Sequence, residues 1–302
     1  LPADWNIALP RLEETLRRFA FRPAGKTEFL TRGWIPPRGE GEFEWDPAAG
    51  RLDPRVVAGH DAVVTLSGSP LRARPWTRSS REQLYSSRVA STRTLAGAIN
   101  QLETPPKVFI SQSGSGIYGD RGDEVLTEAS AVGSSPVMAD VCQRWEEAAL
   151  QASCPTIVTR TGVVLTPRGG ALPRLLLPLR LGLGGPLGTG RQWWPWITLA
   201  DEVRALAFLL ESGLSGPVNV CAPVPAQVDR LVSVLAAELH RPSKFRVPQE
   251  VLTTVLPGLA ENIILASQRM LPERLEAAGF EFDQANPQDA ARWIHDELGR
   301  RS

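Results

Sequence analysis

The chain has few of the residues that build disulfide frameworks and metal sites. Its 302 residues include only three cysteines and three histidines. Cys142, Cys154 and Cys221 are widely spaced, odd in number, and form no CxxC pair. This usage fits a reducing compartment and predicts neither a disulfide framework nor a transition-metal site. We therefore expect a cytoplasmic protein with no bound metal.

The chain also lacks an excess of charge and a long apolar run. Lys and Arg together number 33, as do Asp and Glu, so the formal net charge is zero. A neutral chain has no overall electrostatic signature for nucleic acid or for an anionic membrane. Arginines and glycines interrupt Leu172–Leu187, so no run reaches the roughly 18 apolar residues of a transmembrane helix. We expect no nucleic-acid partner and no membrane span.

What the chain does have, from residue 60 onward, is an alternation of strand and helix patterns. The expected strands are Asp61–Leu66, Lys107–Ser111, Thr156–Thr159 with its continuation Gly162–Leu165, and Val218–Cys221. The expected helices are 79–102, Val137–Ala152 and Asp201–Leu210, the last capped by Asp201. Alternation of this length predicts an α/β fold whose parallel sheet is covered on both faces.

The two ends of the chain differ from this pattern. Leu9–Phe21 has the periodicity of a short amphipathic helix, whereas Pro23–Gly50 is rich in glycine, proline and charge and predicts no element. Past residue 222 the pattern becomes mostly helical. Helices are expected over 226–239, 248–266 and 287–298, with a short strand over Phe245–Val247.

Small polar residues follow three successive strands of the predicted sheet. They are Ser67-Gly68-Ser69, Ser111–Ser115 and Thr161-Gly162. Ordinary turn chemistry explains any one of them. Because ligands of open parallel sheets bind at the carboxyl ends of strands, three such turns in register favour a ligand crevice.

The segment Arg180–Ile197 combines five glycines, two arginines and three tryptophans. Glycine disfavours helix and strand, while tryptophan carries a large apolar face that needs a partner. Two interpretations are open: a loop that closes over a flat or anionic ligand, and a tightly packed loop that joins two layers. Arg191 fits both, because it can bind a phosphate or carboxylate or cap a carbonyl.

Several short motifs recur here in the order found in a known family. They are Phe43–Pro47, Asp61–Gly68, Ser87-Arg88 with Thr92-Arg93, Ile117–Asp123, Trp145-Glu146, Arg160–Leu165, Leu181–Pro186, Gln192–Ile197 and Ser267–Arg269. Over roughly residues 40–300 the chain resembles the YfcH/SulA-like epimerase family. These are atypical extended short-chain dehydrogenase/reductases, loosely called nucleoside-diphosphate-sugar epimerases.

The resemblance implies a Rossmann-type doubly wound parallel sheet that binds NADP, with NAD as the alternative. It also implies a small, mostly helical C-terminal domain that helps form the substrate cleft. The expected division is a connector helix over 1–22, a dinucleotide-binding domain over 23–222 and the small domain over 223–302. The segment 9–22 is similar to the connector of longer bacterial members, in which a lipid-binding-like domain comes first, so Leu1 is not expected to be the true start.

The expected site combines the strand-end turns with residues of the resembling motifs. The cofactor residues would be Ser67, Gly68, Ser69, Arg88, Ser111, Gln112, Thr161, Gly162 and Val163. The substrate residues would be Arg191, Trp193, Trp194 and Trp196. Ser113 and Tyr118 are the catalytic candidates, with packing as the alternative for the tyrosine.

Two departures from the family pattern bear on activity. The family opens with a strand and a glycine fingerprint near G-x-x-G-x-x-G, which residues 1–60 do not contain. Either that unit is missing from the sequence as given, or the chain does not hold a dinucleotide in the usual way. The Tyr-x-x-x-Lys pair of short-chain reductases is also absent, because Met138 and Cys142 stand at the matching positions.

Three functions follow, in order of preference. The first is an NADP-binding oxidoreductase or epimerase-like protein acting on a small polar or nucleotide-linked substrate. The second is a nucleotide-binding sensor or regulatory protein that has lost reductase chemistry. The third is a structural or interaction module. The oligomeric state is left open, with a homodimer as one alternative.

Overall fold

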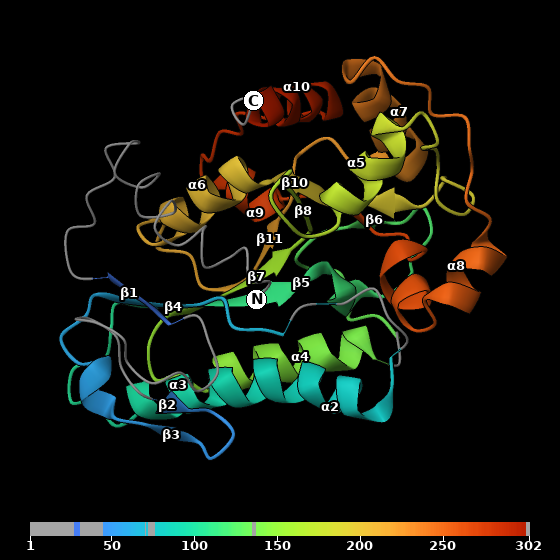
Figure 1. The fold of residues 1–302 in the computed structure, drawn as a ribbon. Coiled ribbons are helices and arrows are strands. Elements are labelled where there is room, and N and C mark those ends of the chain that lie inside the picture. Colours follow the sequence, from blue (N-terminus) through green and yellow to red (C-terminus); the bar gives the residue numbers. More distant parts are fainter. Residues whose placement is uncertain (1–26, 31–44, 70, 72–75, 135–136, 300–302) are drawn as a thin grey trace.

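The computed structural model describes residues 27–30, 45–69, 71, 76–134 and 137–299 (Figure 1). The expected helix Leu9–Phe21 and the connector over 1–22 lie outside these residues. Within the segment Pro23–Gly50, where no element was predicted, the structure places the strand β1 (Thr27–Leu30) and the strand β2 (Trp45–Asp46). β2 forms a two-residue antiparallel ribbon with β3 (Arg51–Leu52).

A five-stranded parallel sheet forms the centre of the molecule, as the alternating pattern predicts. Its order is β1-β4-β5-β7-β11. The bounds are β4 (Ala62–Thr65), β5 (Val108–Gly114), β7 (Thr156–Thr161) and β11 (Gly216–Val220). Every pairing between neighbouring strands is parallel, so the carboxyl ends of all five strands lie at one edge.

Successive strand residues face opposite sides of the sheet, and helices cover both sides (Figure 1). On one face Val63, Phe109 and Val158 pack against α3 (Ser91–Ile99) and α4 (Met138–Ala149). Because helices bury both faces, residues that point to either side of the sheet are apolar, and the strand sequences are continuous apolar runs.

The opposite face uses the neighbouring residue of each strand. There Val64, Ile110 and Ile157 pack with residues of α6 (Leu199–Leu209) and α9 (Glu273–Ala277). The α/β fold with helices on both faces is thereby confirmed, and α9 is a short helix that the sequence pattern did not reveal.

The helix predicted over 79–102 is one helical run with a change of pitch in its middle. It consists of α2 (Arg78–Tyr85), the π-helical turn η2 (Ser86–Ala90) and α3. Such π turns are rare and often occur at functional sites. Here the turn contains Arg88, which the sequence analysis assigned to the cofactor site.

The chain after residue 222 is mostly helical, as expected, but two details were wrong. α7 (Val228–Glu238) and α10 (Pro287–Gly299) lie where predicted. Phe245–Val247 is not a strand, because only Val247 pairs, in an isolated bridge with Leu187. The helix predicted over 248–266 stops early, because Leu256 leaves the helical conformation directly before Pro257, and Gly258 then has a positive φ of 84°. It divides into α8 (Gln249–Val255) and the π turn η4 (Ala260–Ile264).

Three small ribbons connect distant parts of the chain. They pair β8 (Val163–Leu165) with β10 (Trp196–Thr198), β9 (Trp193–Trp194) with β12 (Ala226–Gln227), and β6 (Val125–Leu126) with β13 (Arg269–Met270). Two of these join residues before 222 to residues after it. The boundary at 222/223 therefore crosses hydrogen-bonded pairs, and the division into domains stays a prediction.

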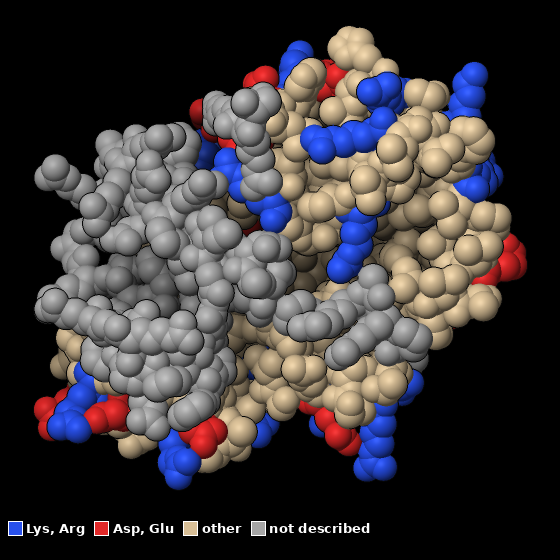
Figure 2. Space-filling model, viewed as in Figure 1, with Lys and Arg blue, Asp and Glu red and all other residues tan. Residues whose placement is uncertain are grey.

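The charged side chains are unevenly spread over the face shown in Figure 2. Lys and Arg side chains stand among uncharged surface at the upper right, and Asp and Glu lie nearer the margins. Figure 1 places α5 (Leu172–Arg180) and the chain between α7 and α8 in that region. A chain whose net charge is zero thus carries a local basic region.

Candidate functional site

The three small polar turns of the sequence analysis lie side by side in the structure. Thr65 of β4 is in register with Ser111 of β5, and Gly114 of β5 is in register with Thr161 of β7. The turns that follow these strands therefore lie at the same edge of the sheet. Parallel strands of this kind place ligands at that edge.

The turn residues divide by exposure into two groups. The side chains of Ser67, Ser111, Ser113 and Thr161 are buried, each at most 5% exposed. Gly68, Ser69, Gln112, Gly162 and Val163 are partly exposed. A ligand at this edge would therefore meet the partly exposed group of turn residues, while the buried hydroxyls hold the turns in shape.

Arg88 is the one cofactor candidate that comes from a helix, and its guanidinium lies against the first turn. Its Nη2 donates to the carbonyl of Ser69 (3.1 Å), and Cζ lies over the ring of Trp145 at 5.4 Å. Gly68 makes this approach possible, because a Cβ there would come within 3.2 Å of Cζ. The π turn and the glycine together bring a positive charge to the end of β4.

The charge of Arg88 has no acidic partner among the residues that the structure describes. The side chain is 8% exposed, and it donates to the carbonyls of Ser69 and Leu84 and to the hydroxyl of Ser87. Burial lowers the pKa of its guanidinium to about 10. A buried cation without a counter-ion is costly, which makes this position suited to an anionic ligand group.

Ser113 is buried and occupied by a structural contact. Its Oγ donates to Oε1 of Glu146 (2.8 Å). The same carboxylate accepts two hydrogen bonds from Arg160, at 3.0 Å from Nε and 2.9 Å from Nη2. Both partners of this bidentate ion pair are less than a tenth exposed. The hydroxyl therefore belongs to a buried network that joins β5, α4 and β7.

Tyr118 ends the 3₁₀ turn η3 (Ser115–Tyr118) and is fully buried. Its hydroxyl donates to Oδ1 of Asn219 (2.6 Å) and accepts from Nη1 of Arg160 (3.0 Å). Burial raises the pKa of the phenol to about 12. These contacts favour the packing alternative for Tyr118, and its catalytic role stays a prediction.

Met138 and Cys142 lie one helical turn apart at the start of α4, against the end of β5. A Cβ on Gly116 would come within 3.1 Å of Met138 Cβ, and one on Gly114 within 3.8 Å of Cys142 Sγ. Both side chains are buried, and burial raises the pKa of the Cys142 thiol to about 12. The two positions of the Tyr-x-x-x-Lys pair are therefore filled with packing residues that cannot move a proton.

Gly162 leaves no space for a side chain, because a Cβ there would overlap the carbonyl oxygen of Pro195. We expect Gly162→Ala to lower the free energy of unfolding by about 2 kcal/mol, since overpacking must push the β8–β10 ribbon away. Urea unfolding would measure this. Gly97→Ala is the matched control, because Gly97 is exposed in α3 with open space around it. That change should stabilise the protein by up to about 1 kcal/mol, and equal effects of the two would contradict the steric argument.

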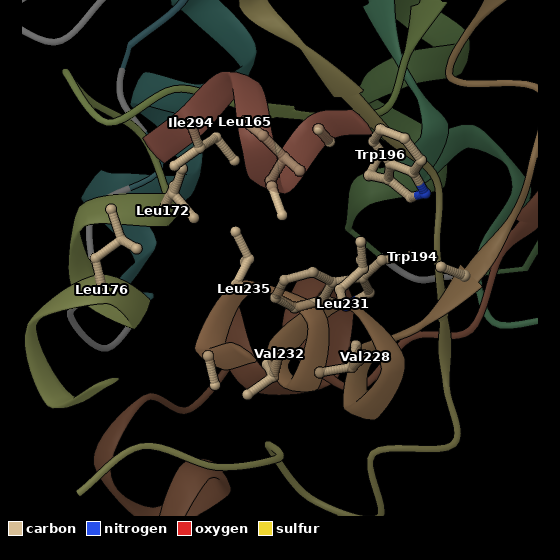
Figure 3. Close-up of a cluster of buried hydrophobic side chains, with 14 of the residues drawn as sticks. Leu165, Leu172, Leu176, Trp194, Trp196, Val228, Leu231, Val232, Leu235 and Ile294 are labelled. Carbon is tan, nitrogen blue, oxygen red and sulfur yellow. The ribbon is translucent and has the colours of Figure 1, made fainter. Parts of the chain in front are cut away.

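Two of the three tryptophans in the glycine-rich segment belong to a hydrophobic core. Trp194 and Trp196 are 5% and 1% exposed, and their indole nitrogens donate to the carbonyls of Ile264 and Val224. Figure 3 shows them beside side chains of α5, α7 and α10. Burial gives both indoles a packing role, so we do not include them in the substrate site proposed below.

Trp193 and Arg191 stay nearer the surface. The Trp193 indole nitrogen donates to Oδ1 of Asp123 (2.6 Å), and the guanidinium of Arg269 lies 4.7 Å from its ring centroid. Ser267 holds this corner by accepting from the Trp193 backbone N–H. Arg191 is exposed, and its backbone N–H donates to Thr189.

α6 begins differently from the prediction and contains an unusual buried acid. Thr198, not Asp201, is the cap, because its Oγ1 accepts from the Asp201 backbone N–H. The Asp201 carboxylate instead accepts from backbone N–H groups of residues 283 and 284. Beside it Glu202 is 2% exposed. Its Oε1 accepts from Thr161 (3.1 Å), and its Oε2 has no partner among the described residues. Burial raises the Glu202 pKa to about 8.

Sequence reasoning missed the roles of Glu146, Arg160 and Glu202. Glu146 and Arg160 stand within family-like motifs, but nothing in those motifs tells a buried ion pair from a site residue. A charged residue on the core-facing side of a helix or inside a buried strand is the signal that could have found all three.

Two further properties concern the kinds of site that the chain offers. Among residues 27–30, 45–69, 71, 76–134 and 137–299, no three His, Cys, Asp or Glu side chains gather as metal ligands would. In the same ranges no helix is long and apolar enough to cross a bilayer.

Two family models match the chain. Residues 54–221 match the NAD dependent epimerase/dehydratase family, and residues 247–294 match a domain of unknown function, DUF1731. The first match contains the strand-end turns and Arg88. The second begins at the bridge residue Val247 and includes α8, α9 and part of α10.

Curated relatives have the same family name. An epimerase family protein of Mycobacterium bovis, Mb2239, is 35% identical over 250 residues, which are 82% of each chain. One of Staphylococcus epidermidis, SERP0438, is 34% identical over 234 residues, 76% of this chain and 78% of the relative.

Solved structures agree with these matches. The human epimerase family protein SDR39U1 (isoform2), crystallised with NADPH, has a TM-score of 0.76 and 31% identity, covering 79% of this chain and 82% of that one. A nucleoside-diphosphate sugar epimerase of Corynebacterium glutamicum has a TM-score of 0.69 and 27% identity, covering 98% of this chain and 63% of that one. The resemblance and the Rossmann-type fold are confirmed: this chain belongs to the NAD dependent epimerase/dehydratase family.

Proposed function

We propose that this chain binds a nicotinamide dinucleotide, with NADP preferred to NAD, at the carboxyl ends of β4, β5 and β7. The observation that carries the proposal is Arg88, a buried guanidinium whose Nη2 lies 3.1 Å from the Ser69 carbonyl and which has no acidic partner in the part of the chain that the structure describes. A phosphate or another electron-rich group of the cofactor would supply the missing counter-charge. The NADPH found with the human relative supports the choice of cofactor.

The residues at this edge fit part of such a cofactor. Gly68 and Gly162 offer backbone without side chains, and Gln112 offers a partly exposed amide. Ser67, Ser111 and Thr161 would act from behind, by fixing the turns, since they are buried. The described residues contain no glycine fingerprint, so this fit covers the side of the cofactor near β4, β5 and β7.

We infer further that the protein works as an epimerase-like oxidoreductase on a small polar or nucleotide-linked substrate in the cytoplasm. The bound nicotinamide would supply hydride chemistry. The protein would orient the substrate, with Trp193, Arg269 and Arg191 as the polar and aromatic contacts. Residues 223–302 would form the substrate-cleft domain, and a homodimer is the assembly we would look for.

A second candidate function is a nucleotide-binding sensor or regulatory protein. One specific observation favours it: the side chains of Ser113, Tyr118 and Cys142, which lie nearest the expected proton-transfer position, are all buried. Met138 and Cys142 replace the Tyr-Lys pair, and the hydroxyls of Ser113 and Tyr118 are bonded to Glu146 and Asn219. Such a site would bind the dinucleotide but would offer the substrate no evident proton donor, as expected of a sensor.

Replacing Arg88 with methionine tests the binding proposal. Methionine keeps much of the apolar stem over Trp145 and removes the charge. We expect NADPH affinity to fall at least about tenfold, because a charge-assisted contact is lost. Quenching of tryptophan fluorescence during NADPH titration would measure it. Arg81→Met, an exposed change on α2, is the matched control and should leave affinity unchanged. Equal affinity of wild type and Arg88→Met would overturn the assignment.

The two candidate functions separate in a second assay. Oxidation of bound NADPH against a broad panel of carbonyl compounds supports the oxidoreductase. Tight binding with no oxidation across the panel supports the sensor. Absence of NADPH and NADH binding to the wild-type protein overturns both.

A further inference from the structure

The end of α5 and the loop that follows leave large apolar side chains in solvent. Leu177, Leu181 and Leu183 are 63%, 67% and 59% exposed, and Phe245 is 56% exposed. The two segments are joined, because the Phe245 backbone N–H donates to the carbonyl of Gly184 (3.2 Å). We call the surface formed by residues 174–183 and 241–246 the leucine–arginine face. A contiguous apolar patch of this kind usually marks an interaction surface.

The same face carries charge of only one sign. Its exposed basic residues are Arg174, Arg180, Arg241, Lys244 and Arg246. Neither segment contains Asp or Glu. Arg246 donates to the carbonyls of residues 188 and 189, and within the described ranges no ion pair reaches the other four. The basic region at the upper right of Figure 2 lies over these elements.

α5 shows how the sequence produces this face. Leu172, Leu176 and Leu179 recur at helical spacing and are buried against α7 and α10 (Figure 3). That stripe satisfies the core. Leu177 and Arg180 fall outside this stripe and are exposed, so the core does not require them.

We propose that the leucine–arginine face docks the protein onto the surface of a bilayer that contains anionic lipid. Exposed leucine and phenylalanine enter the boundary between headgroups and acyl chains, and the surrounding arginines and lysine meet lipid phosphates. The two segments contain no Trp or Tyr, and their exposed leucines and lysine are of types under-represented at protein interfaces, leucine among hot spots and lysine in the interface as a whole. The zero net charge of the whole chain gave no sign of an anionic membrane partner. It hides this local cluster of basic residues because acidic residues elsewhere in the chain balance them.

The test is co-sedimentation of the full chain with vesicles. We expect binding to phosphatidylcholine vesicles that contain about 30% phosphatidylglycerol, little binding to phosphatidylcholine alone, and weakening by added salt. Arg180→Gln and Lys244→Gln should each lower the partition coefficient about fivefold. Leu181→Ser with Leu183→Ser should lower it further, and circular dichroism should show an intact fold because both side chains are exposed.

The matched controls are Leu150→Ser, directly after α4, and Arg93→Gln on α3, two exposed changes that should leave binding unchanged. Absence of binding to anionic vesicles overturns the proposal, as does equal binding to both vesicle types or full binding by the leucine variant. A dimer in sedimentation that Leu181→Ser with Leu183→Ser dissociates, without vesicle binding, would assign the face to a second copy instead. The outcome does not depend on cofactor binding.

Discussion

Replacing Glu202 with glutamine is expected to remove a large pH-dependent loss of stability. Burial raises the Glu202 pKa from its ordinary value of 4.5 to about 8. Between these values the folded protein keeps a proton that the unfolded chain has released. The favourable contribution is therefore complete below pH 4.5 and is lost as the pH rises toward 8. The loss is about 1.4 kcal/mol per pH unit, or roughly 4 kcal/mol by pH 7.5.

Urea unfolding of wild type and Glu202→Gln at intervals from pH 4.5 to 8.5 measures this directly. The stability of the variant relative to wild type should increase by roughly 4 kcal/mol between pH 4.5 and 7.5. At the acidic end the variant should be slightly less stable than wild type. Its side-chain amide must occupy the buried position of Glu202 Oε2, which has no hydrogen-bond partner among the described residues. Glu147→Gln, an exposed change on α4, is the control and should follow the wild-type curve. Parallel curves for Glu202→Gln and wild type would mean that the carboxyl group titrates normally.

The fold could be predicted from the sequence because its elements repeat one simple pattern. Apolar runs such as Val63–Val64 face helices on both sides of a parallel sheet, and small polar residues follow each run. The missed elements are those in which tertiary contacts override local preference. α5 contains Pro178 within its span and is stabilised by its leucine stripe packing on α7. Val247 has the composition of a strand residue, but among the described residues its backbone pairs with Leu187 alone, as an isolated bridge.

The candidate site was predictable in position and less so in the role of each side chain. The register of parallel strands brings Gly68, Gly114 and Gly162 to one edge, which follows from topology alone. Whether a hydroxyl points toward a ligand or into the core is decided by partners far away in sequence. The hydroxyls of Ser113 and Tyr118 point into the core because their hydrogen-bond partners lie there, namely Glu146 for Ser113, and Asn219 and Arg160 for Tyr118.

The glycine–tryptophan segment shows the same limit. Of the two interpretations of Arg180–Ile197, a packed connection between layers describes Trp194 and Trp196, and only Trp193 and Arg191 keep the other interpretation open. Composition cannot separate these cases, because an indole is equally suited to a core and to a ligand platform.

Breaking the buried Glu146–Arg160 pair should produce the second large effect. Glu146→Leu leaves the guanidinium of Arg160 buried without its counter-ion and deprives the Ser113 hydroxyl of its acceptor. We expect the free energy of unfolding to fall by about 3–5 kcal/mol, as when one partner of a buried pair is removed. Urea unfolding at neutral pH provides the measurement. Glu147→Leu is the control one residue further on α4, where the side chain is exposed, and it should cost less than about 1 kcal/mol.

The double variant Glu146→Leu with Arg160→Met decides between an unpaired charge and a simple loss of packing. If the cost of the single change comes from the stranded charge, removing both charges should recover most of the lost stability, because well-packed apolar residues often replace a buried ion pair without penalty. If the double variant is as unstable as the sum of the singles, the pair contributes by shape and the electrostatic argument fails. Arg160 also donates to the Tyr118 hydroxyl at 3.0 Å, so recovery should be incomplete by about the value of one hydrogen bond, roughly 1 kcal/mol. This remaining loss of about 1 kcal/mol should disappear when the same double change is made in a Tyr118→Phe background. In that background there is no hydroxyl that could lose its donor.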